Sequence, residues 1–210
     1  PPATWEDYEM RVAPALKKAG YIGLAQSHSP WIFSENFHSR HNLPMATNNN
    51  GFGGLETEIL YNNDAMITHY SKLAEWQDKG YYKYFGRAWG DNQNAFVNQD
   101  VAIWLGSSGS FGGLKKSAEF EFGTTYLPYW HAITQEPTNT FIGGAALFSM
   151  SGFSDEEYQA VAKFFEFLTD AETQFFWHRE TGYVAITNAA YELAKSSGYY
   201  NENPDAEIGI

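Results

Sequence analysis

Two serines follow an apolar run and precede a predicted helix, a pattern that could bind an anion or a hydroxyl group. The run is Val101–Leu105, and Ser107 and Ser108 come directly after Gly106. Backbone N–H groups at the start of a helix, beside serine hydroxyls, suit a phosphate, a carboxylate or a sugar hydroxyl. Serine is also a favoured N-cap of any helix, so a purely structural role stays open. No lysine follows a GxxxxG spacing, and the sequence therefore gives no support for nucleotide hydrolysis.

A histidine and a tryptophan stand where another predicted strand ends. Residues 21–25 are predicted to form a short buried strand, and His28 and Trp31 follow it. Ligands of α/β proteins bind at the carboxyl ends of the strands. There the indole of Trp31 can stack on the C–H face of a sugar or of glycerol, and the His28 imidazole can donate to an oxyanion or a hydroxyl. The alternative is a tryptophan packed in the core next to a surface histidine.

Two adjacent glycines, Gly143 and Gly144, lie in a strand-like segment over residues 141–150. Because they have no side chains, they allow a ligand to approach the backbone closely. A bulge, or tight packing against another element, explains them equally well.

The remaining titratable residues do not form a catalytic set. His38 and His41 have the i, i+3 spacing of a helical metal site, but no carboxylate is placed to be a third ligand. Glu56 and Glu58 share one face of a predicted strand, as a glycosidase pair would, although a solvated face is far commoner. His178 stands near a predicted helix C-terminus, where a cation favours the helix dipole. GxSxG and HExxH motifs are absent, so the sequence predicts no enzyme, no metal and no cofactor.

The composition excludes several further classes. Lys and Arg number 13 against 25 Asp and Glu, a net charge of −12, whereas a general nucleic-acid binder or a polybasic membrane anchor needs the opposite balance. Cysteine is absent, which removes disulfides and thiol nucleophiles and suits an exported bacterial protein. The aromatic share of 18% predicts a core crowded with rings or a pocket lined with them. No signal peptide is visible, so we expect a cytosolic protein, a processed one or a fragment.

Alternating helices and strands predict an α/β fold with crossover connections and no linker that divides the chain. Thr4, Ser154 and either Asn63 or Asp64 carry the side chain of a helix N-cap. Helices are predicted over residues 5–19, 31–40, 64–79, 91–98, 111–119, 155–168, 171–179 and 188–197, and strands over 21–25, 56–61, 101–105, 124–127 and 141–150.

Several short motifs occur in a fixed order along the chain. They are Pro-Ala-Thr-Trp at 2–5, Trp-Ile-x-x-Glu-Asn-Phe at 31–37, Asn-Leu-Pro at 42–44, Asn-Asn-Gly-Phe at 49–52, Ser-Ser-Gly-Ser at 107–110, Ile-Gly-Gly-Ala at 142–145 and Trp-His-x-x-Thr-Gly-Tyr at 177–183. In this order they resemble the periplasmic solute-binding proteins of ABC importers, specifically the sn-glycerol-3-phosphate-binding branch. The last two motifs are fairly specific to that branch, and the resemblance covers residues 1 to about 204.

The resemblance implies an α/β fold of periplasmic-binding-protein type II, a two-lobed clam-shell that closes on its ligand. It places residues 1–140 in the C-terminal lobe and residues 141–180 in a strand–helix segment that returns to the N-terminal lobe. Residues 181–210 would form a helical return to the C-terminal lobe. Most of the N-terminal lobe is therefore expected to lie outside this sequence.

The same resemblance implies a set of ligand-binding residues: His28, Trp31, Ser107, Ser108, Gly143, Gly144 and Tyr183. The tryptophan would stack on the glycerol part. One of the serines and the backbone near the glycines would hold a phosphoryl group or hydroxyls, and the tyrosine would donate a hydrogen bond.

Two departures from the branch concern the ligand. The branch has a second tryptophan three residues before Trp31, where this chain has His28, and that change could alter the head group accepted. The branch also has a phosphate-pairing arginine soon after the Asn-Pro of the tail, whereas here Asn203 and Pro204 are followed by no arginine up to Ile210. A bidentate arginine is a strong oxyanion partner. The prediction of a phosphate-containing ligand therefore rests on the motifs and not on a visible cation.

Taken together, the residues and the resemblance predict extracytoplasmic capture of glycerol-3-phosphate or a glycerophosphodiester for ABC-type import. The expected partners are a small-molecule ligand and the membrane permease subunits, with no nucleic acid and with a monomeric binding protein. The expected location is the periplasm, or the outer face of the membrane through a lipid anchor in a Gram-positive cell. A neutral-sugar-binding protein of the same fold is the first alternative, and a carbohydrate-active enzyme the second.

Overall fold

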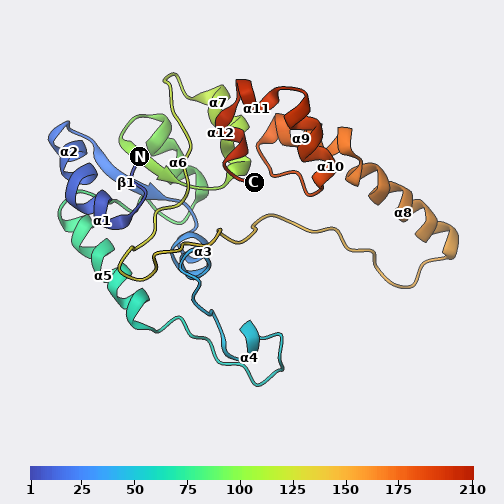
Figure 1. Ribbon diagram of the computed structural model, residues 1–210, viewed down its shortest axis with the longest axis horizontal. Helices are drawn as coiled ribbons and strands as arrows, with labels where there is room; N and C mark the ends of the chain where they lie inside the picture. Colours follow the sequence, from blue (N-terminus) through green and yellow to red (C-terminus); the bar gives the residue numbers. More distant parts are fainter. The chain divides into compact units, whose positions relative to one another are not determined.

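The computed structural model describes residues 1–210, which form two compact units (Figure 1). Unit 1 consists of Pro1–Gly106 and Tyr126–Ile142, and unit 2 of Ser107–Thr125 and Gly143–Ile210. Each unit buries apolar side chains of its own, and each is described by itself.

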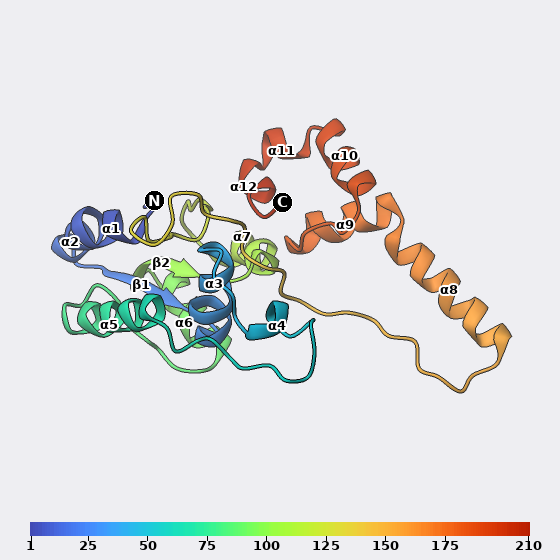
Figure 2. The same ribbon diagram turned by 60° about the horizontal axis from the view of Figure 1, so that its bottom comes forward.

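Unit 1 contains a two-stranded parallel sheet. Strand β1 (Ile22–Gln26) pairs with β2 (Val101–Leu105), and Leu24 lies opposite Ile103. Figure 2 shows the two strands side by side. Parallel strands cannot be joined by a tight hairpin, so the chain between them passes through helices. Four of the five β1 residues are buried, which explains an apolar run where a half-exposed strand would alternate. Both predicted strands are confirmed.

The four helices predicted for unit 1 are present. They are α1 (Trp5–Asp7), the π-helix Tyr8–Val12 and α2 (Ala13–Lys18); the π-helix Pro30–Glu35 and α3 (Asn36–Arg40); α5 (Asp64–Asp78); and α6 (Trp89–Val97). The single turn α4 (Thr47–Asn50) is present in addition to them. The Thr4 hydroxyl accepts a hydrogen bond from the Asp7 amide at 3.2 Å. The Asn63 side-chain oxygen accepts one from the Met66 amide at 3.0 Å. Both N-caps are therefore confirmed.

Aromatic rings form much of the core of unit 1. Trp5 and Tyr8 pack against Trp76 of α5, with ring centroids 5.8 and 5.0 Å apart, and Trp130 stacks on Trp76 at 5.9 Å. All four side chains are buried. Ring pairs of this kind contribute about 0.5–1.5 kcal/mol beyond the burial of apolar area. A large part of the aromatic content therefore serves packing.

Unit 2 is built from short helices and contains no strand. After the 3-10 turn Ser108–Ser110 come α7 (Phe111–Ser117), α8 (Asp155–Thr169), α9 (Ala171–Thr181), α10 (Asn188–Ser196), α11 (Tyr199–Glu202) and α12 (Pro204–Glu207). Helix α9 packs against α7 and α10. Ala194, Tyr200 and Ala206 form the buried core, and Phe111 and Phe175 pack against it. None of the helices in either unit is both long and apolar enough to cross a membrane.

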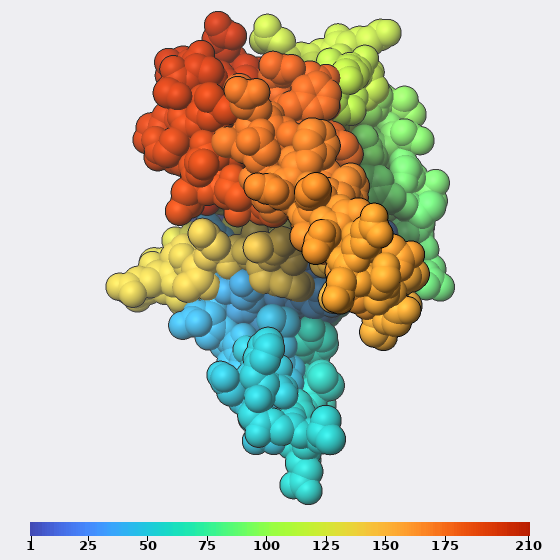
Figure 3. All heavy atoms as spheres, turned by 90° about the vertical axis from the view of Figure 1, so that its right-hand side faces the viewer, coloured from blue at the N-terminus to red at the C-terminus, as the bar shows by residue number.

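Helix α8 and the residues before it expose their side chains. The predicted capping box is present, because the Ser154 hydroxyl accepts from the Glu157 amide while the Glu157 carboxylate accepts from the Ser154 amide at 2.8 Å. No residue of α8 is buried, and Phe164 and Phe167 are 53% and 60% exposed. Residues 143–153 are exposed throughout and form neither helix nor strand. The orange atoms of α8 lie at the surface in Figure 3.

Three of the predicted strands are wrong. Residues 56–61, 124–127 and 141–150 are not paired in a sheet, and the first of these makes only an isolated bridge, between Ala46 and Ile59. An apolar or alternating run becomes a strand only where a neighbouring strand takes up its backbone hydrogen bonds. Neither unit supplies such a neighbour to these segments.

Candidate ligand-binding site

His28 lies in the loop after β1, at the carboxyl end of the parallel sheet. Its φ angle is +49°, a left-handed conformation that is uncommon for a residue with a side chain and is enriched at functional sites. The side chain is exposed. Its ring meets the indole of Trp89 edge to face, with centroids 5.0 Å apart and an interplanar angle of 85°. The loop therefore holds the imidazole outward, beside an indole.

Ser27 fixes the surroundings of that histidine. Its side chain is fully buried, and its hydroxyl donates to the Trp89 carbonyl at 3.0 Å and accepts from Trp104 Nε1 at 3.1 Å. The rings of Trp89 and Trp104 are perpendicular, with centroids 5.6 Å apart. One buried serine thus ties two tryptophans to the end of β1. The sequence analysis missed Trp89, because 62 residues separate it from the serine that holds it.

Trp31 packs in part against the core, which is the alternative that the sequence left open for it. It lies in the π-helix Pro30–Glu35 and is half-buried, with its ring packed against the core of unit 1. Its carbonyl accepts a hydrogen bond from the Asn36 side chain at 3.1 Å. Its Nε1 is buried and has no hydrogen-bond partner. Leaving a buried donor unpaired costs about 1–3 kcal/mol.

Ser107 and Ser108 begin the helical stretch of unit 2, as predicted. The Ser107 hydroxyl accepts from the Gly109 amide at 3.2 Å, and the Ser107 carbonyl accepts from the Ser110 amide at 3.0 Å. This is the N-cap arrangement that was the structural alternative. Ser108 is exposed. Since these two amides are used within the turn, the groups it offers to a ligand are chiefly the hydroxyls.

Tyr183 packs against this turn. A Cβ atom built at Gly109 would lie 2.7–2.9 Å from three atoms of the Tyr183 ring, so the ring fills the space that a side chain would need. A Cβ at Gly144, whose φ is +113°, would lie 3.9 Å from the same ring. Tyr183 is 43% exposed. The structure therefore brings Ser107, Ser108, Gly144 and Tyr183 together.

The backbone of Tyr183 is held by two side chains of α9. His178 is 1% exposed, and its Nδ1 donates to the Tyr183 carbonyl at 2.7 Å. The Thr181 hydroxyl accepts from the Tyr183 amide at 3.1 Å and donates to the Trp177 carbonyl at 2.6 Å. The helix-dipole interpretation of His178 is therefore not what its surroundings indicate. The residue that it meets on its other side, Tyr200, is 22 positions further along the chain and gave no local signal.

Two glycines allow α7 and the end of α9 to approach closely. A Cβ at Gly112 would lie 2.5 Å from the Glu180 carbonyl oxygen, and one at Gly182 would lie 2.5 Å from the Ser108 carbonyl oxygen. Gly182 also has a φ of +87°, as expected for a helix-ending residue. Any side chain at either position would push the Tyr183 loop away from Ser108.

Three buried histidines in unit 1 serve packing and hydrogen bonding. His38 Nε2 accepts from the Asn63 side chain at 3.0 Å, His41 Nε2 from the Trp130 backbone amide at 2.7 Å, and His69 Nδ1 from the Trp130 indole at 3.0 Å. Burial lowers the pKa of all three, that of His69 to about 3. No group of three or more His, Asp or Glu is placed to hold a metal ion.

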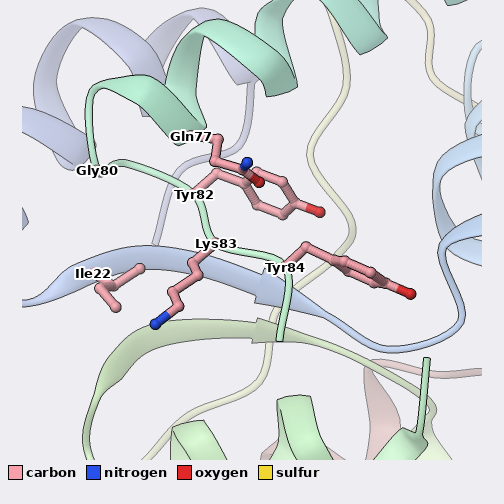
Figure 4. Close-up of a pocket in the computed structure, with 6 residues that line it drawn as sticks. All are labelled: Ile22, Gln77, Gly80, Tyr82, Lys83 and Tyr84. Carbon is pink, nitrogen blue, oxygen red and sulfur yellow. The ribbon is translucent and has the colours of Figure 1, made fainter. Parts of the chain in front are cut away.

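An open hollow of about 360 Å³ lies in unit 1 beside β1. Ile22, Gln77, Gly80, Tyr82, Lys83 and Tyr84 line it, and Figure 4 shows their side chains. None of the residues selected from the sequence is among them, so this hollow is not part of the candidate site.

The candidate residues are therefore divided between the units. His28 and Trp31 belong to unit 1, at the end of β1. Ser107, Ser108, Gly144 and Tyr183 form one cluster in unit 2, and the exposed Gly143 precedes Gly144 in the same unit.

Comparison with known proteins gives consistent matches over the whole chain. A family model described as bacterial extracellular solute-binding protein matches residues 1–207. The sn-glycerol-3-phosphate-binding periplasmic protein UgpB of Salmonella typhimurium is 40% identical over 211 residues, and that of Yersinia pseudotuberculosis is 38% identical over 208 residues. Each match covers 99% of this chain and 47% of the relative. The chain thus spans about half the length of the curated relatives it matches.

Solved structures share the fold. UgpB from Mycobacterium tuberculosis, in complex with glycerophosphocholine, matches with a TM-score of 0.71 and 19% identity, over 99% of this chain and 50% of that chain. The cyclic alpha-maltosyl-1,6-maltose binding protein from Arthrobacter globiformis matches with a TM-score of 0.65 and 19% identity, over 100% of this chain and 52% of that chain. These matches confirm the expected solute-binding-protein fold.

Proposed function

Because the chain belongs to the bacterial extracellular solute-binding protein family, we propose that this protein captures glycerol-3-phosphate or a glycerophosphodiester and delivers it to the permease of an ABC importer. The family and the periplasmic relatives confirm the extracytoplasmic location expected from the sequence. The protein acts by binding, without catalysis, and needs no cofactor.

The cluster in unit 2 is the observation that carries the ligand assignment. Ser107, Ser108 and Tyr183 place three hydroxyl groups around one turn, next to the backbone at Gly144. A phosphoryl group has several oxygens that accept hydrogen bonds, and bonds to a charged acceptor are worth about 1.5–3 kcal/mol each. Hydroxyl donors can therefore hold the anion without an arginine in the cluster.

Trp31 supplies the contact for the carbon skeleton. The indole is half-buried and held against the core, so little conformational entropy is lost when its accessible part meets a glycerol group. Capture then follows the clam-shell mechanism, in which two lobes close by a hinge motion and exclude water from the ligand.

The exposed segment of unit 2 supports the lobe assignment. We assign residues 1–140 to the C-terminal lobe, residues 141–180 to a segment that returns to the N-terminal lobe and residues 181–210 to the C-terminal lobe. At the end of the middle segment, α9 already packs against α7 and α10 of the other two. Phe148, Phe164 and Phe167 are 84%, 53% and 60% exposed. Exposed apolar side chains on one segment are a candidate surface for contact with another part of the protein or with another molecule.

His28 and Trp89 bear on the head group of the ligand. Where the glycerol-3-phosphate branch has a tryptophan, this chain places an imidazole whose ring is perpendicular to Trp89. An imidazole offers a hydrogen bond to a ligand where an indole would offer its face. We therefore assign the pair to the part of the ligand beyond the glycerol.

A neutral sugar is the second candidate ligand. None of the seven candidate residues is a lysine or an arginine, and the three aromatic rings near the end of β1 are suited to the C–H face of a sugar. The same fold serves both ligand classes, so the fold does not decide between them.

Calorimetric titration of the intact protein with glycerol-3-phosphate, glycerophosphocholine and maltose decides between the two. We expect saturable binding of at least one phosphate compound and none of maltose. Tight maltose binding, with no heat from either phosphate compound, would sink the proposal in favour of the sugar.

A further inference from the structure

His178 is a buried residue whose two ring nitrogens each have a polar neighbour. It lies in α9 with its Nδ1 2.7 Å from the Tyr183 carbonyl and its Nε2 3.2 Å from the Tyr200 hydroxyl. A carbonyl oxygen only accepts, so Nδ1 carries the proton and Nε2 accepts from the hydroxyl. The imidazole is thus a bridge between the Tyr183 loop and α11.

Both backbone polar groups of Tyr183 are used by α9. The His178 imidazole donates to the Tyr183 carbonyl, and the Thr181 hydroxyl accepts from the Tyr183 amide. The Gly182 amide donates to the His178 carbonyl at 2.8 Å. With its backbone fixed at both ends, Tyr183 has little freedom beyond rotation of its own side chain. That side chain lies over Gly109, where no Cβ could fit.

The other side of the bridge is firmly anchored. Tyr200 is 6% exposed and belongs to the buried core of unit 2. Its ring packs against Tyr191, whose hydroxyl donates to Glu207 at 2.8 Å. The His178 imidazole therefore links the Tyr183 loop to the buried core of unit 2.

We propose that His178 is a positioning residue for the ligand, acting through Tyr183 and touching no ligand itself. The inference rests on the proposed function, in which the Tyr183 hydroxyl donates to the ligand beside Ser107 and Ser108. The imidazole holds the Tyr183 loop, and with it the Tyr183 hydroxyl, in the arrangement that binds the ligand before the ligand arrives.

A double-mutant cycle on the intact protein tests the coupling. Glycerol-3-phosphate affinity is measured by calorimetry for Tyr183→Phe, for His178→Ala and for both together. Each single change is expected to weaken binding about ten-fold, and the double variant is expected to bind within about two-fold of Tyr183→Phe. If the double variant loses affinity by the product of the two single fold-losses, His178 acts independently of Tyr183 and the inference is overturned.

Two near-isosteric variants separate positioning from simple burial. In His178→Asn the side-chain amide nitrogen takes the place of Nδ1, and the donor to the Tyr183 carbonyl is kept. In His178→Gln the amide nitrogen takes the place of Nε2, and that donor is lost. We expect the Asn variant to bind within about three-fold of the unsubstituted protein and the Gln variant to match His178→Ala. Equal affinities of the Asn and Gln variants would contradict the proposal.

Hydrogen exchange without ligand provides a readout that does not depend on the ligand. The amides of Gly182 and Tyr183 should exchange faster in His178→Ala and His178→Gln than in His178→Asn. Equal exchange in all three overturns the inference, even if glycerol-3-phosphate binds. If no phosphate compound binds the unsubstituted protein, the proposed function fails while the exchange result still decides whether His178 holds the loop. Circular dichroism confirms that each variant is folded.

Discussion

The two units hold their candidate ligand residues in different ways. In unit 1, Trp31 is fixed by packing on an aromatic core and His28 by a loop that follows a buried strand. In unit 2 the core is small, and Tyr183 is fixed by hydrogen bonds from α9 and by glycines that let the backbones touch. A packed side chain can be replaced by another of similar volume at a small cost in stability. A hydrogen bond is lost when its donor and acceptor move apart, and a close backbone contact leaves no room for an added side chain. Substitutions should therefore act gradually in unit 1 and sharply in unit 2.

The histidines of the two units show the same contrast. His41 and His69 in unit 1 accept hydrogen bonds from N–H groups of Trp130, which cannot reverse. A second proton on either ring would sit on the accepting nitrogen and would face the hydrogen of a Trp130 N–H group. His178 in unit 2 faces the hydroxyl of Tyr200, which can turn to accept. Protonation of His41 or His69 should therefore destabilise unit 1.

The largest effect is expected from acid on the stability of unit 1. The pKa values of His38, His41 and His69 are lowered below 6.5 by burial, so the unfolded chain binds more protons than the folded one. This contribution to stability is fully present above pH 6.5 and is lost as the pH falls, for His69 down to its folded-state pKa of about 3, by up to about 1.4 kcal/mol per pH unit for that residue. Urea unfolding followed by tryptophan fluorescence at pH 7.5, 6.5, 5.5 and 4.5 measures the slope.

His69→Asn is the control for that slope. The side-chain oxygen keeps an acceptor near the position of Nδ1 but does not titrate, so the slope should fall by the share of one histidine. A slope that is the same in the variant and the unsubstituted protein would show that His69 is not a source of the acid sensitivity.

The next effect is expected from Gly112 in unit 2. A Cβ there would meet the Glu180 carbonyl at 2.5 Å, whereas one at Gly113, the next residue of α7, would meet nothing within 4 Å. Gly112→Ala should destabilise by on the order of 1–3 kcal/mol. Gly113→Ala should be neutral or stabilise by up to about 1 kcal/mol, because alanine is the better helix former. Equal thermal shifts for the two variants would remove the close α7–α9 contact from the account.

Trp31→Ala tests how packing in unit 1 serves binding. The change should weaken ligand binding ten-fold or more, a loss of about 1.4 kcal/mol or greater. Trp177→Ala in unit 2 is the matched control, since that indole is 56% exposed and is not a candidate ligand residue; its affinity should stay within two-fold. An unchanged affinity in Trp31→Ala, measured by calorimetry, would make Trp31 a core residue only.

The smallest effect is expected at the exposed end of unit 2. Ser154→Ala removes the capping box of α8 and should cost about 1 kcal/mol of helix stability. Since no residue of α8 is buried, the loss should appear as faster hydrogen exchange in the first turn of α8, with little change in ligand affinity. A ligand affinity that falls as far as in Trp31→Ala would show that α8 takes part in binding.

Local signals predicted the helices but not all of the strands. Thr4, Asn63 and Ser154 cap their helices as expected, because a cap is a contact between residues three apart. Strands depend on a partner that the local sequence does not contain, so residues 101–105 were predicted correctly and residues 124–127 were not. The π-helical turns also have no signal at the level of residue spacing.

Candidate residues could be selected from the sequence where they fall within a short motif. Ser107, Ser108 and Tyr183 were selected by motif, and the structure brings them together through Gly109. Trp89 was not recognised as a support, because its partner Ser27 is 62 residues away, and the link from His178 to Tyr200 spans 22 residues. Second-layer contacts of this kind arise from the fold and are not visible in a motif.

The central claim is that the unit 2 cluster meets the phosphoryl group of the ligand. Titration of glycerol-3-phosphate with the intact protein, followed by the phosphorus-31 resonance, tests it most directly. We predict a shift that saturates at one equivalent of protein and that weakens when Ser108 is changed to alanine and Tyr183 to phenylalanine. A phosphorus resonance that does not change with added protein would contradict the account.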